Sequence, residues 1–509
     1  LSPQDTIVTT ACIASRLFKT MEIKNDEGQV IETDNKSWFY NFLLPLHQHF
    51  GKNLYLEVQE HKDQKQVAYN KKILVLHNKL KIPMIHANDS HYIYEGDSQY
   101  RDLFLKAKGM VYSDESNFIL DYPDSEIVLL RYKRQSILSE QQAIDALKAT
   151  QIFDYAEPVY TDKEFKIPKV PNKFIWEELG DTKYTNENPD EVLNTIIDRS
   201  WQKKKEKTKP EKIPEYEEAI KYETDIVRKC KMADYFILDH IVVDRAVKKY
   251  DAVLTRSGRG SAVSFLINSL LGLTEVDRIK APTKLYPTRF MSAERILKSR
   301  SLPDIDLNFA DVTPVIKATE DILGKDGIKY MVAYKPLQRS SAFRLWCKAR
   351  GYEIGEYDEI AKLFADKKNT DEEIKEQFTQ WQVEIEYSKI FRGVIESVAP
   401  SPCSFLLSNN PISEMIGLIK VGDQICCCLD GYNCDVYKFL KNDYLTVKIY
   451  SIISKVYKLI GRPIDDISTL INNCDEKVWD IYKNGLTCTI NQADSDSGRN
   501  LVMRYKPHN

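Results

Sequence analysis

Apolar and polar positions in the first third of the chain alternate in two ways, which predict both strands and helices. Short apolar runs typical of strands lie at 6–13 and 82–89. Residues 67–80 repeat apolar positions every three to four residues, which predicts a helix packed on one face. This mixture predicts an α/β domain over about 1–165, and the two prolines in 166–174 predict a linker after it.

The rest of the chain has longer helical patterns that are interrupted by strand-like runs. Residues 214–250 predict two helices, either separate or continuous, with Pro214 early in the first. Residues 251–255 predict a short strand, and the pattern from about 335 to 397 is strongly helical. Strands and turns return at 406–431, and the remainder is mainly helical.

Composition limits the class of protein. The chain has 509 residues, which corresponds to about three or four domains of ordinary size. Its 43% hydrophobic and 29% charged residues are typical of a soluble globular protein. No apolar run approaches the ~18 residues of a membrane span. Lys and Arg number 72 and Asp and Glu 75, so any surface for a polyanionic partner must be local.

Ten cysteines in 509 residues are ordinary for a protein of a reducing compartment. None of them forms a CxxC pair, which argues against a zinc finger or a thioredoxin-like motif. Cys426, Cys427 and Cys428 are adjacent in an apolar run. On a strand, neighbouring side chains point to opposite faces, so these three cannot form a compact chelate. We therefore expect buried free thiols.

The strongest local signal for chemistry is the segment 303–311, PDIDLNFAD, which contains Asp304 and Asp306. On a strand, residues two apart lie on one face. Paired carboxylates on a rigid strand suit two Mg²⁺ ions about 3.5–4 Å apart, the arrangement used for phosphoryl transfer. The alternative is an ordinary Asp-x-Asp sequence at the end of a strand.

A glycine-containing turn in 256–273 follows the predicted short strand and precedes an apolar helix. Gly260 permits close backbone approach, Ser261 is a natural helix N-cap, and Arg259 adds positive charge. Exposed N–H groups in a first helical turn bind anions. A plain helix-capping turn explains the same residues, since the GxxxxGK[ST] pattern of a Walker A loop is absent.

A third candidate is Lys441 and Asp443, which share a face if 441–450 is a strand. Alone, this alternation is ordinary on exposed strands. Together and in this order, the segments resemble the family C replicative DNA polymerases, the family of the bacterial DNA polymerase III alpha subunit. Residues 257–277 resemble the family's glycine–serine motif, and 303–309 the catalytic strand.

Further segments extend the resemblance. Residues 441–445 are similar to the later strand that carries the third catalytic carboxylate, and 289–296 to the arginine-bearing segment before the catalytic strand. Residues 484–507 resemble the early fingers. Residues 9–15, 55–63 and 82–93 resemble the second half of the family's PHP domain. The resemblance therefore extends over nearly the whole chain.

The PHP resemblance implies a second metal site, for Zn²⁺ or Mn²⁺. In relatives with an intact site, residues matching Cys12, His61, Asp89 and His91 contribute ligands. The first half of that domain, with its His-x-His ligands, is not in this sequence. We therefore expect a structural remnant, and a live phosphoesterase is the alternative.

The fold implied by the resemblance is an α/β multidomain one. It combines a PHP-type α/β domain, a polymerase beta-like nucleotidyltransferase palm with a mixed sheet, a helical thumb and the start of helical fingers. The expected domains are the C-terminal part of the PHP domain at 1–165, the first part of the palm with the catalytic Asp pair at 166–334, the thumb at 335–398, the returning palm with the third carboxylate at 399–455, and the start of the fingers at 456–509.

The activity implied is that of a DNA-directed DNA polymerase, which adds deoxynucleotides to a primer 3′-hydroxyl by two-metal-ion phosphoryl transfer in DNA replication. Asp304, Asp306 and Asp443 would be catalytic and hold two Mg²⁺ ions. The residues expected to bind the triphosphate are Arg259, Gly260, Ser261 and Lys441. The residues expected to grip duplex phosphates in the thumb are Arg339, Arg344, Lys348 and Arg350, for which ordinary surface charge is the alternative.

The implied partners are primer-template DNA and dNTPs, with a sliding clamp and an exonuclease subunit reached through regions absent here, and no membrane. The implied location is the cytoplasm of a bacterial cell, or of the host cell if a phage encodes the chain. Two alternatives are a polymerase-derived DNA-binding scaffold that is inactive in this form and a PHP-type phosphoesterase or 3′-5′ exonuclease. Since the sequence starts at Leu1 without Met and lacks most of the fingers, we expect a partial polymerase.

Overall fold

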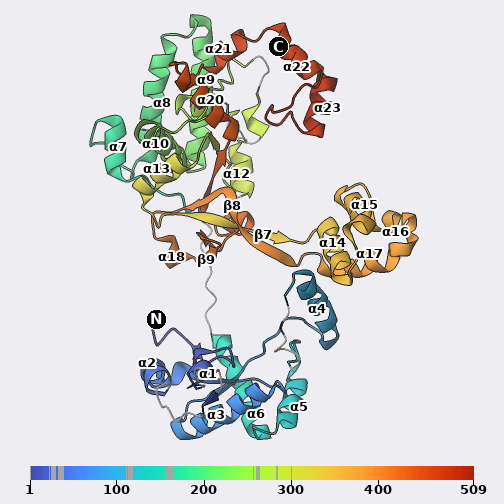
Figure 1. Cartoon of the computed structure of the whole chain (residues 1–509). Coiled ribbons are helices and arrows are strands. Elements are labelled where there is room, and N and C mark those ends of the chain that lie inside the picture. Colours follow the sequence, from blue (N-terminus) through green and yellow to red (C-terminus); the bar gives the residue numbers. More distant parts are fainter. Residues whose placement is uncertain are drawn as a thin grey trace. The chain divides into compact units, whose positions relative to one another are not determined.

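The chain folds into two compact units, each assembled from two separate stretches (Figure 1). The first unit comprises Leu1–Tyr160 and Pro336–Val394, and the second comprises Thr161–Lys335 and Ile395–Asn509. The computed structural model describes residues 2–21, 23–24, 30–31, 39–110, 112, 118–155, 164–255, 257–258, 264–281, 285–289, 291–299 and 301–508. The assignment of these units to particular polymerase domains stays a prediction.

The first unit is an α/β fold around a parallel sheet with strand order β1-β4-β5, and it also contains a separate antiparallel pair of β2 and β3. Its N-terminal elements are β1 Val8–Thr9, α1 Arg16–Met21, β2 Ile23–Lys24, β3 Val30–Ile31, α2 Leu44–Phe50, β4 Leu54–Val58, α3 Gln64–Leu80, β5 Met84–His86, α4 Ser98–Ala107, α5 Ser125–Gln135 and α6 Glu140–Ala149. The predicted helix at 67–80 and the strands within 6–13 and 82–89 are confirmed by α3, β1 and β5.

A helical cluster completes the first unit. Its helices are α14 Arg339–Arg350, α15 Ile354–Ala365, α16 Asp371–Gln377 and α17 Gln382–Ser388. Their core is aromatic, and Trp346 stacks on Tyr387 with ring centroids 5.8 Å apart. Helix α4 packs into the same core through Ala107 and the partly buried Phe104. The strongly helical pattern predicted from about 335 to 397 is confirmed over this cluster.

The second unit contains a larger sheet covered by helices. Its elements are α7 Asn172–Leu179, α8 Pro189–Lys205, α9 Ile213–Lys229, α10 Ala233–Tyr250, α11 Leu266–Leu270, α12 Ala293–Ser299, β6 Asp306–Phe309, α13 Thr313–Leu323, β7 Ile328–Pro336, β8 Ile395–Leu407, α18 Ile412–Met415, β9 Leu418–Val421, β10 Gln424–Cys427, α19 Gly431–Val436, β11 Leu440–Thr446, α20 Lys448–Leu459, α21 Ile467–Asn472, α22 Glu476–Lys483 and α23 Asp496–Tyr505. Pro214 lies in the first turn of α9, as predicted. The predicted pair at 214–250 is two separate helices, because Lys231 takes a left-handed φ of 54° between them.

The six strands lie in the order β6-β11-β8-β7-β10-β9. The sheet is mixed, since β11 is parallel to β6 and antiparallel to β8, while β10 is parallel to β7 and antiparallel to β9. The predicted strand at 251–255 is reduced to a single bridge between Leu254 and Phe309 at the β6 edge. All ten thiols are free, and Cys426 and Cys427 are buried as expected, whereas Cys428 is only partly buried, which corrects the expectation for that residue.

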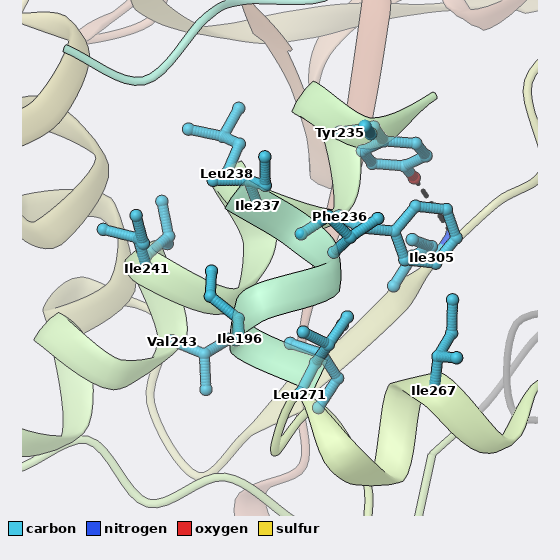
Figure 2. Packing of buried hydrophobic residues seen from close by; sticks show 14 of the residues in the cluster. Ile196, Tyr235, Phe236, Ile237, Leu238, Ile241, Val243, Ile267, Leu271 and Ile305 are labelled. Atoms are coloured by element: carbon cyan, nitrogen blue, oxygen red, sulfur yellow. Dashed lines mark hydrogen bonds between the residues drawn. The ribbon is translucent and has the colours of Figure 1, made fainter. Parts of the chain in front are cut away.

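The largest apolar core joins the helices of the second unit to the sheet. Helix α10 lies at its centre, with Phe236 and Leu238 fully buried among side chains from α8, α11 and the segment before β6 (Figure 2). Burial of this kind is worth about 1.5–3 kcal/mol per large apolar side chain relative to exposure. The helix therefore gives the two neighbouring strands β6 and β11 a rigid support. Over the described residues, no helix is both long and apolar enough to cross a membrane.

Candidate active site

The site begins with two aspartates that face each other across neighbouring strands. Strand β11 runs parallel to β6, and Asp443 is the register partner of Asp306. Neighbouring strands of a sheet lie about 4.8 Å apart, so residues in register carry their side chains at the same level. From the sequence we expected each of these two segments to contribute a catalytic carboxylate. The parallel ladder brings them together across 137 positions of chain.

Asp304 lies just outside this ladder. Strand β6 begins at Asp306, so the prediction that both aspartates of the Asp-x-Asp sequence lie within one strand is corrected. Asp304 instead forms an ion pair with Lys441 of β11, with Asp304 Oδ1 3.2 Å from Lys441 Nζ. Partial burial lowers the pKa of Lys441, but the carboxylates of Asp304 and Asp443 outweigh it and hold that pKa above its ordinary value. Lys441 is therefore a permanent cation beside the carboxylates.

The surroundings of Asp443 suit an oxygen ligand for a cation. Its Oδ1 is buried and accepts no hydrogen bond from the described residues. Burial and the charges of Asp443 and Asp306 raise the pKa of the nearby Cys403 thiol, which keeps it protonated. In the described part of the chain, however, no three His, Cys, Asp or Glu side chains come close enough to hold a metal ion. Strand pairing thus brings the carboxylates of Asp306 and Asp443 into register, and the third carboxylate, Asp304, is paired with Lys441.

The opposite face of β11 is buried against α10. Along this strand Leu440, Asn442 and Tyr444 are buried, whereas Lys441 and Asp443 are partly exposed. Asn442 Nδ2 donates a hydrogen bond of 2.6 Å to Oδ1 of Asp239 on α10, a carboxyl with no exposed surface. Desolvation raises the pKa of Asp239 to about 8, although the bond from Asn442 opposes this rise.

Sequence reasoning missed Asp239, although the sequence held a signal. It is a single carboxylate inside the apolar run YFILDHIVV, where the helical pattern places it on a buried face. Tyr235, four residues earlier, was also missed. Its hydroxyl accepts a hydrogen bond of 3.2 Å from the backbone N–H of Ile305, between Asp304 and Asp306 (Figure 2).

The residues predicted to bind the triphosphate lie mostly outside the described part of the chain. Arg259, Gly260 and Ser261 lie outside the described residues, and Lys441 is the one member of the set with a position. The helix after this turn, α11, begins at Leu266 with Phe265 as its N-cap, and the predicted N-cap Ser261 lies outside the described residues.

The start of helix α11 is held by a hydrogen bond to a buried carboxylate. Glu223 of α9 has no exposed surface, accepts a bond of 3.0 Å from the N–H of Ile267, and pairs with Arg278 Nε at 2.8 Å. Burial raises the pKa of Glu223, although Arg278 opposes this. The two ends of the segment 267–278 are thereby joined to one side chain. The described part of the chain thus supports the segment that follows the glycine-containing turn.

The four basic residues predicted to grip DNA lie on α14. Three of them form ion pairs with acidic side chains of the same helical cluster, and Lys348 is exposed. The pairs are Arg339 with Asp371 at 2.8 Å, Arg344 with Asp358, and Arg350 with Glu384 at 3.9 Å. Arg339 also lies over the Phe364 ring, 5.3 Å from its centroid. Ion pairing within the cluster accounts for much of their charge, and DNA binding by these residues stays a prediction.

The four predicted PHP ligands lie after the carboxyl ends of three parallel strands. Cys12 follows β1, His61 follows β4, and Asp89 and His91 follow β5. They share one sheet edge, but do not form a metal-holding group within the described residues. Burial lowers the pKa of His61 to about 4, and neither of its ring nitrogens has a hydrogen-bond partner among the described residues.

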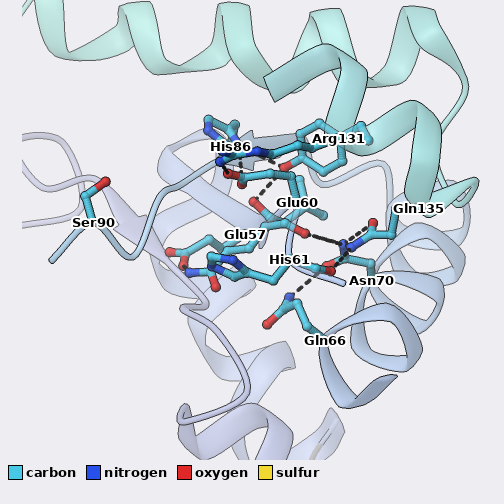
Figure 3. A network of polar contacts seen from close by, with 12 residues as sticks. Glu57, Glu60, His61, Gln66, Asn70, His86, Ser90, Arg131 and Gln135 are labelled. Carbon is cyan, nitrogen blue, oxygen red and sulfur yellow. Dashed lines mark hydrogen bonds and ion pairs between the residues drawn. The ribbon is translucent and has the colours of Figure 1, made fainter. Parts of the chain in front are cut away.

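A buried polar network occupies the same region (Figure 3). The guanidinium of Arg131 donates to both carboxylate oxygens of Asp121, at 2.7 and 2.8 Å, and lies 3.5 Å from Glu60. His86 Nδ1 is 2.8 Å from the hydroxyl of Tyr132, which itself donates to the backbone. Burial lowers the pKa of His86 to about 4, so it is neutral at pH 7. An arginine thus neutralises carboxylates in the network.

Comparison with known proteins identifies the family. A family model described as the bacterial DNA polymerase III alpha NTPase domain matches residues 192–446, half of the chain, ending with the last residue of β11. The chain belongs to the bacterial DNA polymerase III alpha family. The match includes Asp304, Asp306 and Asp443, together with the supporting helix α10.

Relatives extend the similarity to 90% of the chain. DNA polymerase III subunit alpha of Aquifex aeolicus is 24% identical, that of Bacillus subtilis 25% and that of Campylobacter jejuni 23%. The chain covers 42% of the Aquifex protein and 40% of each of the other two. The family that the sequence motifs resemble is therefore confirmed. The chain spans about two fifths of the length of these relatives.

Proposed function

We propose that the chain carries the palm of a replicative DNA-directed DNA polymerase, a nucleotidyltransferase of polymerase beta-like fold that extends a primer by two-metal-ion phosphoryl transfer. The observation that carries this proposal is the register of Asp306 with Asp443 on adjacent parallel strands. Membership of the DNA polymerase III alpha family supports it. Both strands rest on a rigid core, which is the support that accurate positioning requires.

Asp304, Asp306 and Asp443 are the residues we assign to hold two Mg²⁺ ions. The buried and unpaired Oδ1 of Asp443, opposite Asp306, fits a hard cation. When bound, the two ions would activate the primer hydroxyl and stabilise the charge on the leaving pyrophosphate. Asp304, which is paired with Lys441, would have to give up that ion pair to serve as a third ligand. Lys441 would stay close by as a donor for a phosphate oxygen.

The reaction is a displacement at the α-phosphorus of the incoming dNTP. The primer 3′-oxygen loses its proton and forms the new bond, and the bond to the bridging oxygen of pyrophosphate breaks. This chain's contribution is to hold the reacting groups in line and to neutralise charge. We assign triphosphate binding to Arg259, Gly260 and Ser261 with Lys441. We assign primer-template contact to the helical cluster α14–α17, where Lys348 is exposed.

The first unit supports a structural role for the PHP-like part, Leu1–Tyr160 of that unit. Its buried histidines are neutral, and Arg131 neutralises Asp121 and contacts Glu60. We therefore propose a stable remnant in place of a phosphoesterase or a 3′-5′ exonuclease. Other expected features remain proposals of the same kind: the domain boundaries, Zn²⁺ or Mn²⁺ binding, the clamp and exonuclease partners, and a cytoplasmic location.

The test is primer extension by the 509-residue chain and by Asp306→Ala and Asp443→Ala. We expect loss of incorporation by at least about 100-fold for each, because both are assigned as metal ligands. Asp423→Ala is the matched control, since Asp423 is an exposed carboxylate between β9 and β10 of the same sheet. Full activity in Asp306→Ala or Asp443→Ala would overturn the assignment.

The same assay separates the alternatives. Duplex-DNA binding without dNTP incorporation by the wild-type chain would replace the proposal with that of an inactive scaffold. Trimming of 3′ ends with Mn²⁺ or Zn²⁺, abolished by His61→Ala, would support a PHP nuclease and contradict the structural remnant. We expect neither result.

A further inference from the structure

Helix α10 carries two buried polar side chains one turn apart, and each reaches a different carboxylate-bearing segment. Tyr235 is 1% exposed and lies within the largest apolar core, and Asp239 has no exposed surface. Residues at i and i+4 share one helix face, so both side chains point toward the sheet. The Tyr235 hydroxyl contacts the chain leading into β6, and Asp239 contacts β11.

Tyr235 fixes the backbone on both sides of Asp304. Its hydroxyl oxygen accepts a bond of 3.2 Å from the N–H of Ile305, and the same hydroxyl donates to the carbonyl of Pro303 at 3.3 Å. Burial raises the pKa of Tyr235 well above its usual range, so the hydroxyl keeps its proton and can donate. The contact can therefore hold Asp304 at a fixed position before β6.

Asp239 fixes β11 between Lys441 and Asp443. It accepts a bond of 2.6 Å from Asn442 Nδ2. The other two oxygens of this pair, Asp239 Oδ2 and Asn442 Oδ1, are both buried and have no hydrogen-bond partner among the described residues. A proton on Asp239 Oδ2 would supply the donor that the pair lacks, because a carboxylic acid and an amide can exchange two hydrogen bonds.

The groups that face Asp239 bring no positive charge that would favour its ionised form. They are two tyrosines, Tyr235 on the same helix and Tyr444 on β11, and burial raises the pKa of each, so both hydroxyls are neutral. Thr319 of α13 bonds to the Tyr444 hydroxyl at 3.1 Å and brings no charge. No cation is among the groups that shift the pKa of Asp239 over the described residues. The apolar surroundings therefore favour the neutral, protonated form of Asp239.

We propose that Tyr235 and Asp239 are positioning residues. Together they fix the chain that leads into β6 and strand β11 relative to each other, and so the aspartates that these segments carry. The proposal rests on the proposed function, since it concerns the same metal-holding aspartates. Neither residue touches substrate; each acts through the backbone or through Asn442. Burying a carboxyl group in an apolar core lowers the stability of the fold. Such a loss of stability is expected where a functional site must be held in place.

The experiment compares Mn²⁺ binding, followed by electron paramagnetic resonance, with primer extension. The proteins are the 509-residue wild type, Asp239→Leu, Asp239→Asn, Tyr235→Phe and Asp443→Ala. We expect Asp239→Leu and Tyr235→Phe to bind Mn²⁺ about 10-fold more weakly or worse, with a matching rise in the metal concentration needed for activity. Asp239→Asn should stay within about 3-fold of wild type, because an amide keeps two hydrogen bonds with Asn442.

The variants separate positioning from folding and from the proposed function. If Asp239→Leu does not fold, Tyr235→Phe and the Asp239→Asn rescue decide, since Tyr235→Phe removes one hydroxyl from an aromatic ring that stays packed. Wild-type Mn²⁺ affinity in folded Asp239→Leu or Tyr235→Phe would overturn the positioning role. Failure of Asp239→Asn to preserve binding would overturn it also. If Asp443→Ala binds Mn²⁺ like the wild type, the proposed metal site itself is wrong, whatever the Asp239 variants show.

Discussion

Lys441 Nζ lies 3.2 Å from Asp304 Oδ1, which joins the cation of β11 to the carboxylate before β6. The side chain of Lys441 is 20% exposed and that of Asp304 59% exposed, so the pair is partly solvated. Pairs of this kind contribute only about 0–1 kcal/mol to the free energy of unfolding. The main effect of this ion pair is therefore on the site and not on stability, because it keeps the positive charge of Lys441 beside the carboxylates.

Lys441→Gln is expected to reduce primer extension by about 100-fold, because the site loses a fixed donor for transition-state charge. The melting temperature should change little, since the ion pair is partly solvated. The control is Lys420→Gln, which removes an exposed lysine from β9 in the same sheet. Steady-state kinetics with circular dichroism melts would measure both effects. Unchanged activity would show that Lys441 does not act on the nucleotide.

Asp239→Asn is expected to become more stable than the wild type as the pH rises. The folded pKa of Asp239 is about 8 against an ordinary value of 3.8. The stabilisation due to its protonated form is therefore complete below about pH 4 and is lost as the pH rises toward 8. Asparagine has no such loss, so the difference should grow between pH 5 and 8 to at most about 5 kcal/mol.

Thermal melts of both proteins across that pH range measure the difference, with Asp423→Asn as an exposed control. The difference in unfolding free energy between wild type and Asp239→Asn should level off above pH 8. A difference that is independent of pH would show that Asp239 is already ionised in the folded chain.

The sequence could group the carboxylates because their spacing is a local property: Asp304 and Asp306 are two apart, as are Lys441 and Asp443. It could not show that β6 begins only at Asp306 and leaves Asp304 outside the strand. The bond between Asp239 and Asn442 joins positions 203 residues apart, and no local pattern indicates which buried groups will meet. Only the packing of α10 against β11 determines that contact.

Strand content was harder to predict around the helical cluster. Strand β8 extends over Ile395–Leu407 although it contains Pro400 and Pro402, which ordinarily argue against a strand. Strand β7 precedes the cluster and was not predicted either. The two are neighbours in the sheet, so the chain leaves the second unit on β7 and returns on β8. Pairing over this long range overrides local propensity.

Gly327→Ala is expected to destabilise the second unit by about 1–3 kcal/mol, because the added methyl group has no room. A Cβ at this position would lie 2.4 Å from the carbonyl oxygen of Leu323 and 2.6 Å from that of Ser408. Gly355→Ala is the matched control, since a Cβ there meets nothing within 4 Å and lies in helix α15. That control should be neutral or more stable by up to about 1 kcal/mol. Urea unfolding curves for the two variants would test the contrast, and equal stability would contradict it.

Glu223→Ala is expected to destabilise the chain by about 3–5 kcal/mol, because it leaves Arg278 as a partly buried cation without its partner. It also removes the acceptor for the N–H of Ile267, so the start of α11 loses an anchor beside the glycine-containing turn. The double variant Glu223→Leu with Arg278→Met removes both charges and should recover much of the lost stability.

Nucleotide binding separates the two roles of Glu223. If this anchor supports the turn that binds the triphosphate, dNTP affinity measured by calorimetry should stay weakened in the double variant although stability returns, because Ile267 still lacks its acceptor. Recovery of both stability and dNTP affinity would show that Glu223 serves only to neutralise Arg278. A stability loss in Glu223→Ala below about 1 kcal/mol would show that the buried pair is solvated in solution.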